Sequence, residues 1–263
     1  MKIAWYNTAT LIVSDNGARI LIDPFFTYTP ARQALKNNYF PLFRSCDAIL
    51  LTHGHFDHAH DAVEIIKDTA IPVYCTESPQ KQLLRRGLNK EQTRCVTISD
   101  SFSIGGFVIK AYKGAHAKFG LPLIFNTVMR KNFWAQFSKS IKIGFSAMFS
   151  EREAKETVIY EIIGSDKQSV IILGSMGIAD KTAYPKGADL LVLPYQGRSD
   201  LVDYSIKMLE LFNPKKVLLD HFNDYAPPIS SLVDYSGFLE AAKKLYPNID
   251  IIVPEIAEQL TVN

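Results

Sequence analysis

Three histidines and an aspartate lie within one short stretch of the chain, His53-Gly54-His55-Phe56-Asp57-His58. Imidazole nitrogens and a carboxylate oxygen are the ligands that zinc, and divalent iron or manganese, prefer. The alternation lets His53 and His55 face one ion while Asp57 and His58 turn toward another. Gly54 allows backbone angles that a side chain would forbid in a loop folded around an ion. The stretch therefore predicts a metal site and could begin two of them.

The segments on either side of this loop must hold it in place. The apolar run 48–51 before it predicts a buried strand, and the apolar positions of 61–67 after it have helical spacing. The alternative is a polar loop with incidental histidines. An affinity tag is excluded by the internal position and by the interleaved residues.

The pattern His53-x-His55-x-Asp57-His58 after a hydrophobic strand resembles the signature of the metallo-β-lactamase-fold hydrolases. The segment 20–24, Ile-Leu-Ile-Asp-Pro, also resembles that family, in which the third strand often ends Ile-Asp-Pro. The resemblance implies an α/β protein with a four-layer αβ/βα sandwich and metals at one edge. We expect one domain over residues 1–263, with residues 118–150 as an insertion.

The resemblance also implies two further ligands, each in a loop that follows a strand. His116 follows the predicted strand 107–112, where the family has the third ligand of its first metal. His221 follows the predicted strand 216–220, where the family has its final ligand. These positions imply one cation held by His53, His55 and His116, and another held by Asp57, His58 and His221. His60 matches no ligand position, and we expect it at the surface or behind the ligands.

The chain departs from the family pattern in two places. The family usually has Gly-Asp where this chain has Gly174-Ser175, and that aspartate bridges the two metals. A hydroxyl is a poor ligand at neutral pH, although a subgroup with serine here still holds two zinc ions. Ser175 and the nearby Asp180 are therefore candidates for the metal site or its surroundings. The first turn, 7–10, also lacks the histidine of the Gly-His-Ala-Ser-like stretch found in many relatives.

The implied ligands favour hydrolysis by a metal-bound hydroxide. One or two divalent ions, Zn²⁺ first and Mn²⁺ or Fe²⁺ as alternatives, lower the pKa of a bound water from ~15.7 toward ~7. The expected target is an ester, lactone or phosphodiester bond of a small or lipid-like substrate, with Asp57 as the catalytic residue that orients the nucleophile. Substrate contacts are expected from Phe25, Tyr28, Tyr195, Gln196 and Arg198. An equal alternative for Phe25 and Tyr28 is that they close the edge of the sandwich.

Composition narrows the classes to which the protein can belong. The formal net charge is +2, which offers no general argument for binding nucleic acid or acidic membranes. The three cysteines, at positions 46, 75 and 95, lack Cys-x-x-Cys spacing and favour a reducing compartment. No stretch resembles a secretion signal or a membrane-spanning helix. We expect a cytoplasmic protein, and an oligomer is compatible with the sequence.

Residues 118–150 are rich in aromatic and basic side chains and contain no acidic residue. One interpretation is a lid that contacts an amphipathic substrate or a membrane surface. The other, slightly favoured, is a helical excursion whose aromatic side chains pack on the body.

Two other functions stay open on the sequence alone. A metal-binding or sensing protein without turnover is suggested by Ser175, and a nucleic-acid processing nuclease is disfavoured by the near-neutral charge.

Overall fold

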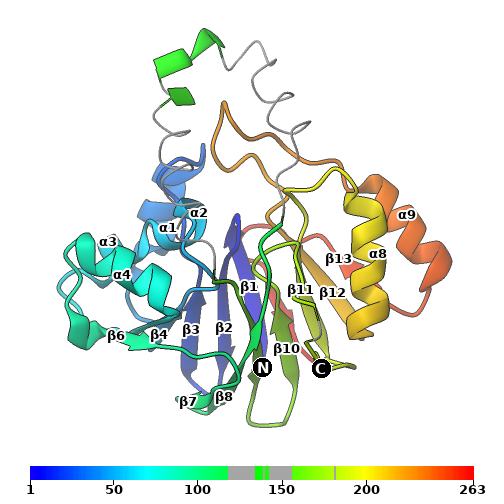
Figure 1. The fold of residues 1–263 in the computed structure, drawn as a ribbon, viewed down its shortest axis with the longest axis horizontal. Coiled ribbons are helices and arrows are strands. Elements are labelled where there is room, and N and C mark those ends of the chain that lie inside the picture. Colours follow the sequence, from blue (N-terminus) through cyan, green and yellow to red (C-terminus); the bar gives the residue numbers. More distant parts are fainter. Residues whose placement is uncertain (118–133, 139, 142–155, 181) are drawn as a thin grey trace.

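Two sheets face each other in this computed structural model, with helices on both outer surfaces (Figure 1). The structure describes residues 1–117, 134–138, 140–141, 156–180 and 182–263. This arrangement confirms the predicted α/β class and four-layer αβ/βα sandwich. Most of the predicted insertion at 118–150 lies outside the described residues.

The first sheet begins with an antiparallel meander and continues with parallel strands. Asn16 and Gly17 in the first hairpin have φ angles of 46° and 87°, as a tight two-residue turn requires. The strands lie in the order β14-β1-β2-β3-β4-β5-β6. Their bounds are β1 Lys2–Asn7, β2 Thr10–Asp15, β3 Ala18–Ile22, β4 Ala48–Leu50, β5 Val73–Cys75, β6 Thr93–Cys95 and β14 Gln259–Thr261.

The second sheet has the order β13-β12-β11-β10-β9-β8-β7. It is antiparallel from β7 to β10 and parallel from β10 to β13. Its strands are β7 Ser101–Ile104, β8 Phe107–Lys113, β9 Val158–Ile163, β10 Ser169–Ile172, β11 Leu190–Pro194, β12 Lys216–Asp220 and β13 Asp250–Ile252.

Helices cover the outer face of each sheet (Figure 1). Those beside the first sheet are α1 Arg32–Phe43, α2 Phe56–Ala59, α3 Ala62–Ile66 and α4 Glu77–Arg85, followed by a 3₁₀ turn at Lys90–Gln92. Those beside the second are α8 Leu201–Phe212 and α9 Ser236–Leu245, which contact each other. Among the described residues, no helix is long and apolar enough to cross a membrane.

The largest cluster of buried apolar side chains contains residues from both sheets, among them Trp5, Leu50, Ile109 and Leu219. Every residue of β11 is buried, as expected for a parallel strand covered on both faces. Each large side chain removed from water contributes about 1.5–3 kcal/mol to folding. This shared core fixes the relative position of the strand ends. The predicted ligands lie in the segment after β4, which includes α2, and in the loops after β8 and β12.

Candidate metal centre

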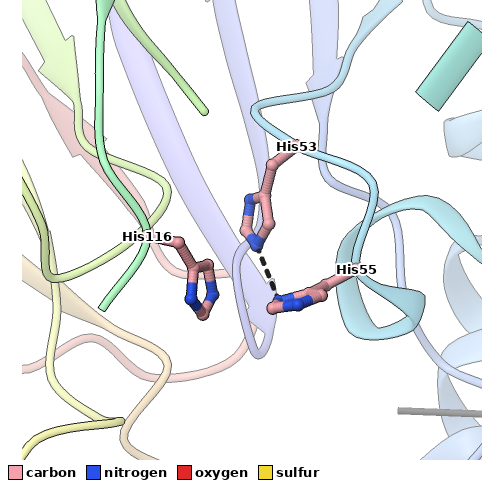
Figure 2. Close-up of side chains that lie close together, drawn as sticks. All are labelled: His53, His55 and His116. Atoms are coloured by element: carbon pink, nitrogen blue, oxygen red, sulfur yellow. Dashed lines mark hydrogen bonds between the residues drawn. The ribbon is translucent and has the colours of Figure 1, made fainter. Parts of the chain in front are cut away.

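His53, His55 and His116 form the first group of side chains that could hold a metal ion. One ligand atom of each lies within 4.8 Å of the others. The Nε2 atom of His53 is 3.2 Å from the Nδ1 atom of His55, and the rings of His55 and His116 are 4.2 Å apart. Figure 2 shows the three rings converging, His116 from the segment after β8 and the others from the loop after β4.

Burial keeps these three imidazoles neutral. It lowers the pKa of His55 to about 3 and that of His116 to about 4. Burial, aided by the neighbouring His58, also lowers the pKa of His53 well below its usual value. At neutral pH all three therefore carry the lone pairs that a cation needs.

Asp57, His58 and His221 form the second group, again with ligand atoms within 4.8 Å of one another. Burial alone would raise the pKa of Asp57, but His58 and the contact with His221 hold it well below its usual range. Burial alone would lower the pKa of His58, but the carboxylates of Asp23 and Asp57 raise it. The rings of His53 and His58 are 4.0 Å apart, so the two groups adjoin.

Asp23 orients one histidine in each group. This buried aspartate follows β3 with a φ angle of 43° and accepts a 2.8 Å hydrogen bond from His58 Nδ1. It also accepts hydrogen bonds from the backbone N–H and the hydroxyl of Thr52, at 2.8 and 2.5 Å. Because the Thr52 hydroxyl donates to Asp23, its oxygen accepts from His53 Nδ1, 2.9 Å away. These bonds use the Nδ1 atoms of His53 and His58, so Nε2 is the atom of each ring that could bind a metal.

His221 is held by the ends of two other strands. Its Nδ1 atom donates to the side-chain oxygen of Gln196, just beyond β11, over 2.8 Å. Its backbone N–H donates to Thr8 over 2.8 Å, and its own φ angle is 56°. Strained backbone at a ligand position is maintained by surrounding contacts of this kind.

The first turn is part of this support. Asn7 accepts a 2.7 Å hydrogen bond from Asn223, and Asn223 accepts a 3.1 Å bond from the backbone N–H of Thr8. Asn7 also donates to the backbone oxygen of Phe25 over 3.2 Å. The turn that lacks the histidine of many relatives therefore ties the loop after His221 to the loop after β3.

The donor set fits divalent cations. His221 donates its Nδ1–H to Gln196, and its Nε2 atom lies 3.1 Å from an oxygen of the ionised Asp57 carboxylate. Both atoms could therefore bind the same cation. Asp220 adds to the case, because it is buried and neither of its carboxylate oxygens has a hydrogen-bond partner among the described residues. Nearby positive charge would stabilise such a carboxylate.

Ser175 lies at the edge of the first group. It is buried, and its Oγ atom accepts a 3.1 Å hydrogen bond from the backbone N–H of Ala117, next to His116. Asp180 is exposed and belongs to neither group found among the described residues. The structure therefore places Ser175, and not Asp180, beside the candidate ligands.

Two aromatic candidates for substrate contact pack around the site. Phe25 is 1% exposed and packs against Phe56 and Tyr225, with ring centroids 5.7 and 6.1 Å away. Tyr28 is half-buried against Phe56 and His60, at 5.9 and 5.8 Å. This packing matches the alternative in which these rings close the edge of the sandwich.

The three candidates after β11 have structural contacts. Tyr195 is 1% exposed and stacks on Phe238 of α9, so its side chain lies in the core, which corrects the expected substrate contact. Gln196 bonds to His221 as described above. The Arg198 guanidinium makes two hydrogen bonds with Asp200, at 2.7 and 2.8 Å, and lies 3.6 Å from the ring centre of Tyr204.

Sequence reasoning missed Tyr225 and the positioning role of Gln196. Tyr225 lies in the loop after β12, and its ring centroid is 4.9 Å from that of His221. Its only signal in the sequence is a position four residues beyond a predicted ligand. His60, expected outside the ligand sets, belongs to neither of the described groups.

Known proteins resemble this chain in sequence. A family model described as a beta-lactamase superfamily domain matches residues 18–133. A UPF0173 metal-dependent hydrolase of Methanobrevibacter smithii is 25% identical over 265 residues, covering 100% of this chain and 98% of that protein. Another, of Methanocaldococcus jannaschii, is 26% identical over 259 residues, covering 98% and 99%.

Among solved structures, a metallo hydrolase of Ignicoccus hospitalis has the same fold. Its TM-score is 0.66 at 18% sequence identity, and the match covers 98% of this chain and 97% of that one. At this identity the likeness speaks for the fold alone. Taken with the family model and the full-length relatives, it supports the metallo-β-lactamase-fold superfamily of metal-dependent hydrolases.

Proposed function

We propose that this protein hydrolyses an ester, lactone or phosphodiester bond of a small or lipid-like substrate, with one or two divalent cations as cofactor. The observation that carries the proposal is the meeting of two potential ligand groups at one edge of the sandwich. They come from three segments far apart in the sequence, and the rings of His53 and His58 join them at 4.0 Å.

Zn²⁺ is the proposed ion, with Mn²⁺ or Fe²⁺ as alternatives, because five imidazoles and one carboxylate make up the two groups. His53, His55 and His116 would hold one cation, and Asp57, His58 and His221 the other. Bound cations would supply Lewis-acid polarisation of the scissile group and activate water near neutral pH.

The chain's own residues supply orientation and proton handling. Asp57 is ionised at neutral pH because its pKa is held low, so it can accept a proton and orient a nucleophile. Asp23 keeps His53 and His58 in the tautomers that expose Nε2, through Thr52 and by direct contact. Preorganisation of this kind lowers the cost of ordering the site when substrate binds.

Contact with a lipid surface is a further proposal, supported by a described part of the predicted insertion. Trp134 and Phe137 are 59% and 48% exposed, and their rings stack at 5.5 Å. Sedimentation with anionic liposomes tests this contact. Binding that is lost when residues 118–150 are deleted supports it, and equal negligible binding of both proteins rejects it.

A second candidate function is metal binding or sensing without turnover. Ser175 favours it, because a hydroxyl stands where a carboxylate would bridge two cations, and this hydroxyl already accepts a hydrogen bond from Ala117. Without a bridging carboxylate, the second cation would bind more weakly. A reaction that uses two cations depends on that second site.

Metal analysis followed by an activity panel separates these functions. The panel contains bis-p-nitrophenyl phosphate, simple lactones and esters, and a precursor tRNA. Metal-dependent turnover of one of the first three classes supports the proposal. Stoichiometric metal with no turnover across the panel indicates the sensing protein, and cleavage of the tRNA alone indicates a nuclease.

A further inference from the structure

We propose that Cys75 and Cys95 form a reversible disulfide between neighbouring strands when the protein meets a low-molecular-weight disulfide such as oxidised glutathione. The proposal goes beyond the proposed function and does not depend on it, because neither cysteine belongs to the candidate ligand groups found among the described residues. It assigns a modification site to two thiols that the hydrolytic reaction does not use.

The register of the first sheet places the two cysteines next to each other. Strands β5 and β6 are parallel, and Cys75 is the Cα partner of Cys95. The backbone N–H of Val96 donates a 2.8 Å hydrogen bond to the carbonyl oxygen of Cys75, which fixes this register. Neighbouring strands lie about 4.7–4.9 Å apart, and the two Cα atoms of a disulfide are usually about 4.4–6.8 Å apart. The backbone spacing of the pair therefore suits a disulfide.

Both thiols lie on the face of the sheet that α4 covers. Cys75 packs in the apolar cluster that includes Leu83 of α4. On β6, the Thr93 hydroxyl accepts a 2.8 Å hydrogen bond from the side-chain amide of Gln80, also in α4. Side chains alternate between the faces along a strand, so Cys95, two residues after Thr93, points to the same face. The two sulfur atoms are therefore on one side of the sheet.

The position of β6 allows the pair to close. The Cβ atoms of a disulfide are about 3.5–4.5 Å apart, slightly less than the spacing between strands. Among the strands that the structure describes, β6 is at the end of its sheet and pairs with β5 alone. It is three residues long, so a small shift toward β5 breaks no pairing with another described strand.

The two thiols differ in access, and this difference gives each of them a role. Cys95 is exposed and Cys75 is buried, so a soluble disulfide reaches Cys95 first. The Cys95 thiolate attacks oxidised glutathione, which forms a mixed disulfide and releases one glutathione thiol. Cys75 then loses its proton and attacks the Cys95 sulfur, and the second glutathione leaves as a thiol. In sum, two protein thiols and one glutathione disulfide give one protein disulfide and two glutathione thiols.

The environment slows both steps but does not prevent them. Burial raises the pKa of Cys75, and burial together with the charges of Glu77 and Glu156 raises the pKa of Cys95. Because the thiolate is the reactive form, oxidation at neutral pH is slow. The product is still favoured, since Cys75 is held beside the mixed disulfide and competes with free glutathione at a high effective concentration.

The experiment incubates the full-length protein with an excess of oxidised glutathione at about pH 9, where more of each thiol is ionised. Intact mass and peptide maps without reductant identify the product. We expect wild type to lose two hydrogen atoms, to retain no glutathione and to keep one free thiol of its three. The map should contain a peptide cross-linked between Cys75 and Cys95, which dithiothreitol separates.

Two variants define the roles of the thiols. Cys75→Ser should retain one glutathione on Cys95, because no second thiol displaces it. Cys46→Ser is the matched control, since Cys46 is also buried but lies in the loop between α1 and β4. It should give the same cross-link as wild type.

Wild type that retains glutathione on Cys95, as Cys75→Ser does, would overturn the inference. Three free thiols after prolonged incubation, or a cross-link that includes Cys46, would overturn it as well. The decisive result comes from wild type, so a variant that fails to fold leaves the test intact. Neither metal content nor hydrolysis enters the measurement, so the proposed function stands or falls separately.

Discussion

At the level of single residues, the candidate centre depends on the partners of its histidines as much as on the histidines. Asp23 bonds to His58 directly and to His53 through Thr52, and Gln196 bonds to His221. Each partner occupies Nδ1 and leaves Nε2 for a metal. Because these partners come from the ends of β3, β4 and β11, three parts of the fold set three tautomers.

Replacing one predicted ligand, with a nearby histidine as the control, tests which residues bind the metal. We expect His53→Ala to abolish hydrolysis and lower the metal content, because it removes a ligand that belongs to the first group. The matched change His60→Ala should leave both near wild type, since His60 belongs to neither described group and packs beside Tyr28. Metal content by elemental analysis and initial rates measure the two effects. Comparable losses in the two variants would show that the ligands are wrongly assigned.

The metal-free protein should lose stability as the pH falls from about 6.5 toward about 4. The unfolded chain binds protons at the ordinary histidine pKa of ~6.5. In the folded chain burial lowers the pKa of His55 to about 3 and of His116 to about 4, and that of His53 also lies well below its usual value. The unfolded state therefore takes up more protons in this range, and stability rises with pH.

His58 acts in the opposite direction because its pKa is raised, so the stability it contributes is lost as the pH rises through its folded value. The pKa of His60 is lowered by burial as well, so four histidines with lowered pKa values outweigh the one with a raised pKa between pH 4 and 6.5. Urea unfolding at several pH values measures the slope, which should be shallower in His116→Gln. A slope that is flat, or unchanged in the variant, would contradict the account.

At the level of elements, loops from both sheets press together around the ligands. Gly174 lies in the loop after β10 and has a φ angle of 66°. A Cβ atom added there would overlap the side chain of Thr52, which lies between Asp23 and His53 in the hydrogen-bond chain. A residue without a side chain is therefore needed at this contact.

Gly174→Ala should destabilise the protein by about 2–4 kcal/mol, since strain at positive φ adds to overpacking. Gly187→Ala is the matched control, because its φ angle is 77° but nothing lies within 4 Å of an added Cβ. The control should cost about 1 kcal/mol, from the backbone conformation alone. Denaturant unfolding compares the two, and equal losses would mean that contact with Thr52 costs nothing.

The elements that carry strong local signals were predictable. The apolar run before the ligand loop and the predicted strand before His221 both appear where the sequence places them. Helix α1 was not predicted, because its apolar positions are sparse and Pro41 lies within it. The pairing of β14 with β1 was also missed, because a three-residue strand has no period to detect.

The candidate ligands were more predictable than their partners. The loop at 53–58 contains its residues consecutively, so spacing reveals them, and resemblance supplied His116 and His221. Gln196 bonds to His221 from another loop, and the ring of Tyr225 packs against Phe25 from a distant part of the chain. Only tertiary structure reveals such contacts. Tyr195 was predicted to contact substrate, but its side chain packs in the core against Phe238. Successive side chains point in opposite directions here, so Gln196 faces His221 instead.

At the level of the whole molecule, the candidate centre joins the two sheets. His53, His55, Asp57 and His58 come from the first sheet, and His116 and His221 from the second. The shared apolar core holds these strand ends in position, and the bond from Asn223 to Asn7 closes the same edge. Each potential ligand group takes residues from both sheets, so a bound cation would connect the two halves of the fold.

Anomalous diffraction at the zinc edge, from crystals of the Zn²⁺-loaded protein, tests the central claim most directly. We predict one peak among His53, His55 and His116 and a second among Asp57, His58 and His221. Peaks confined to other parts of the surface, with neither group of side chains coordinating an ion, would contradict the account.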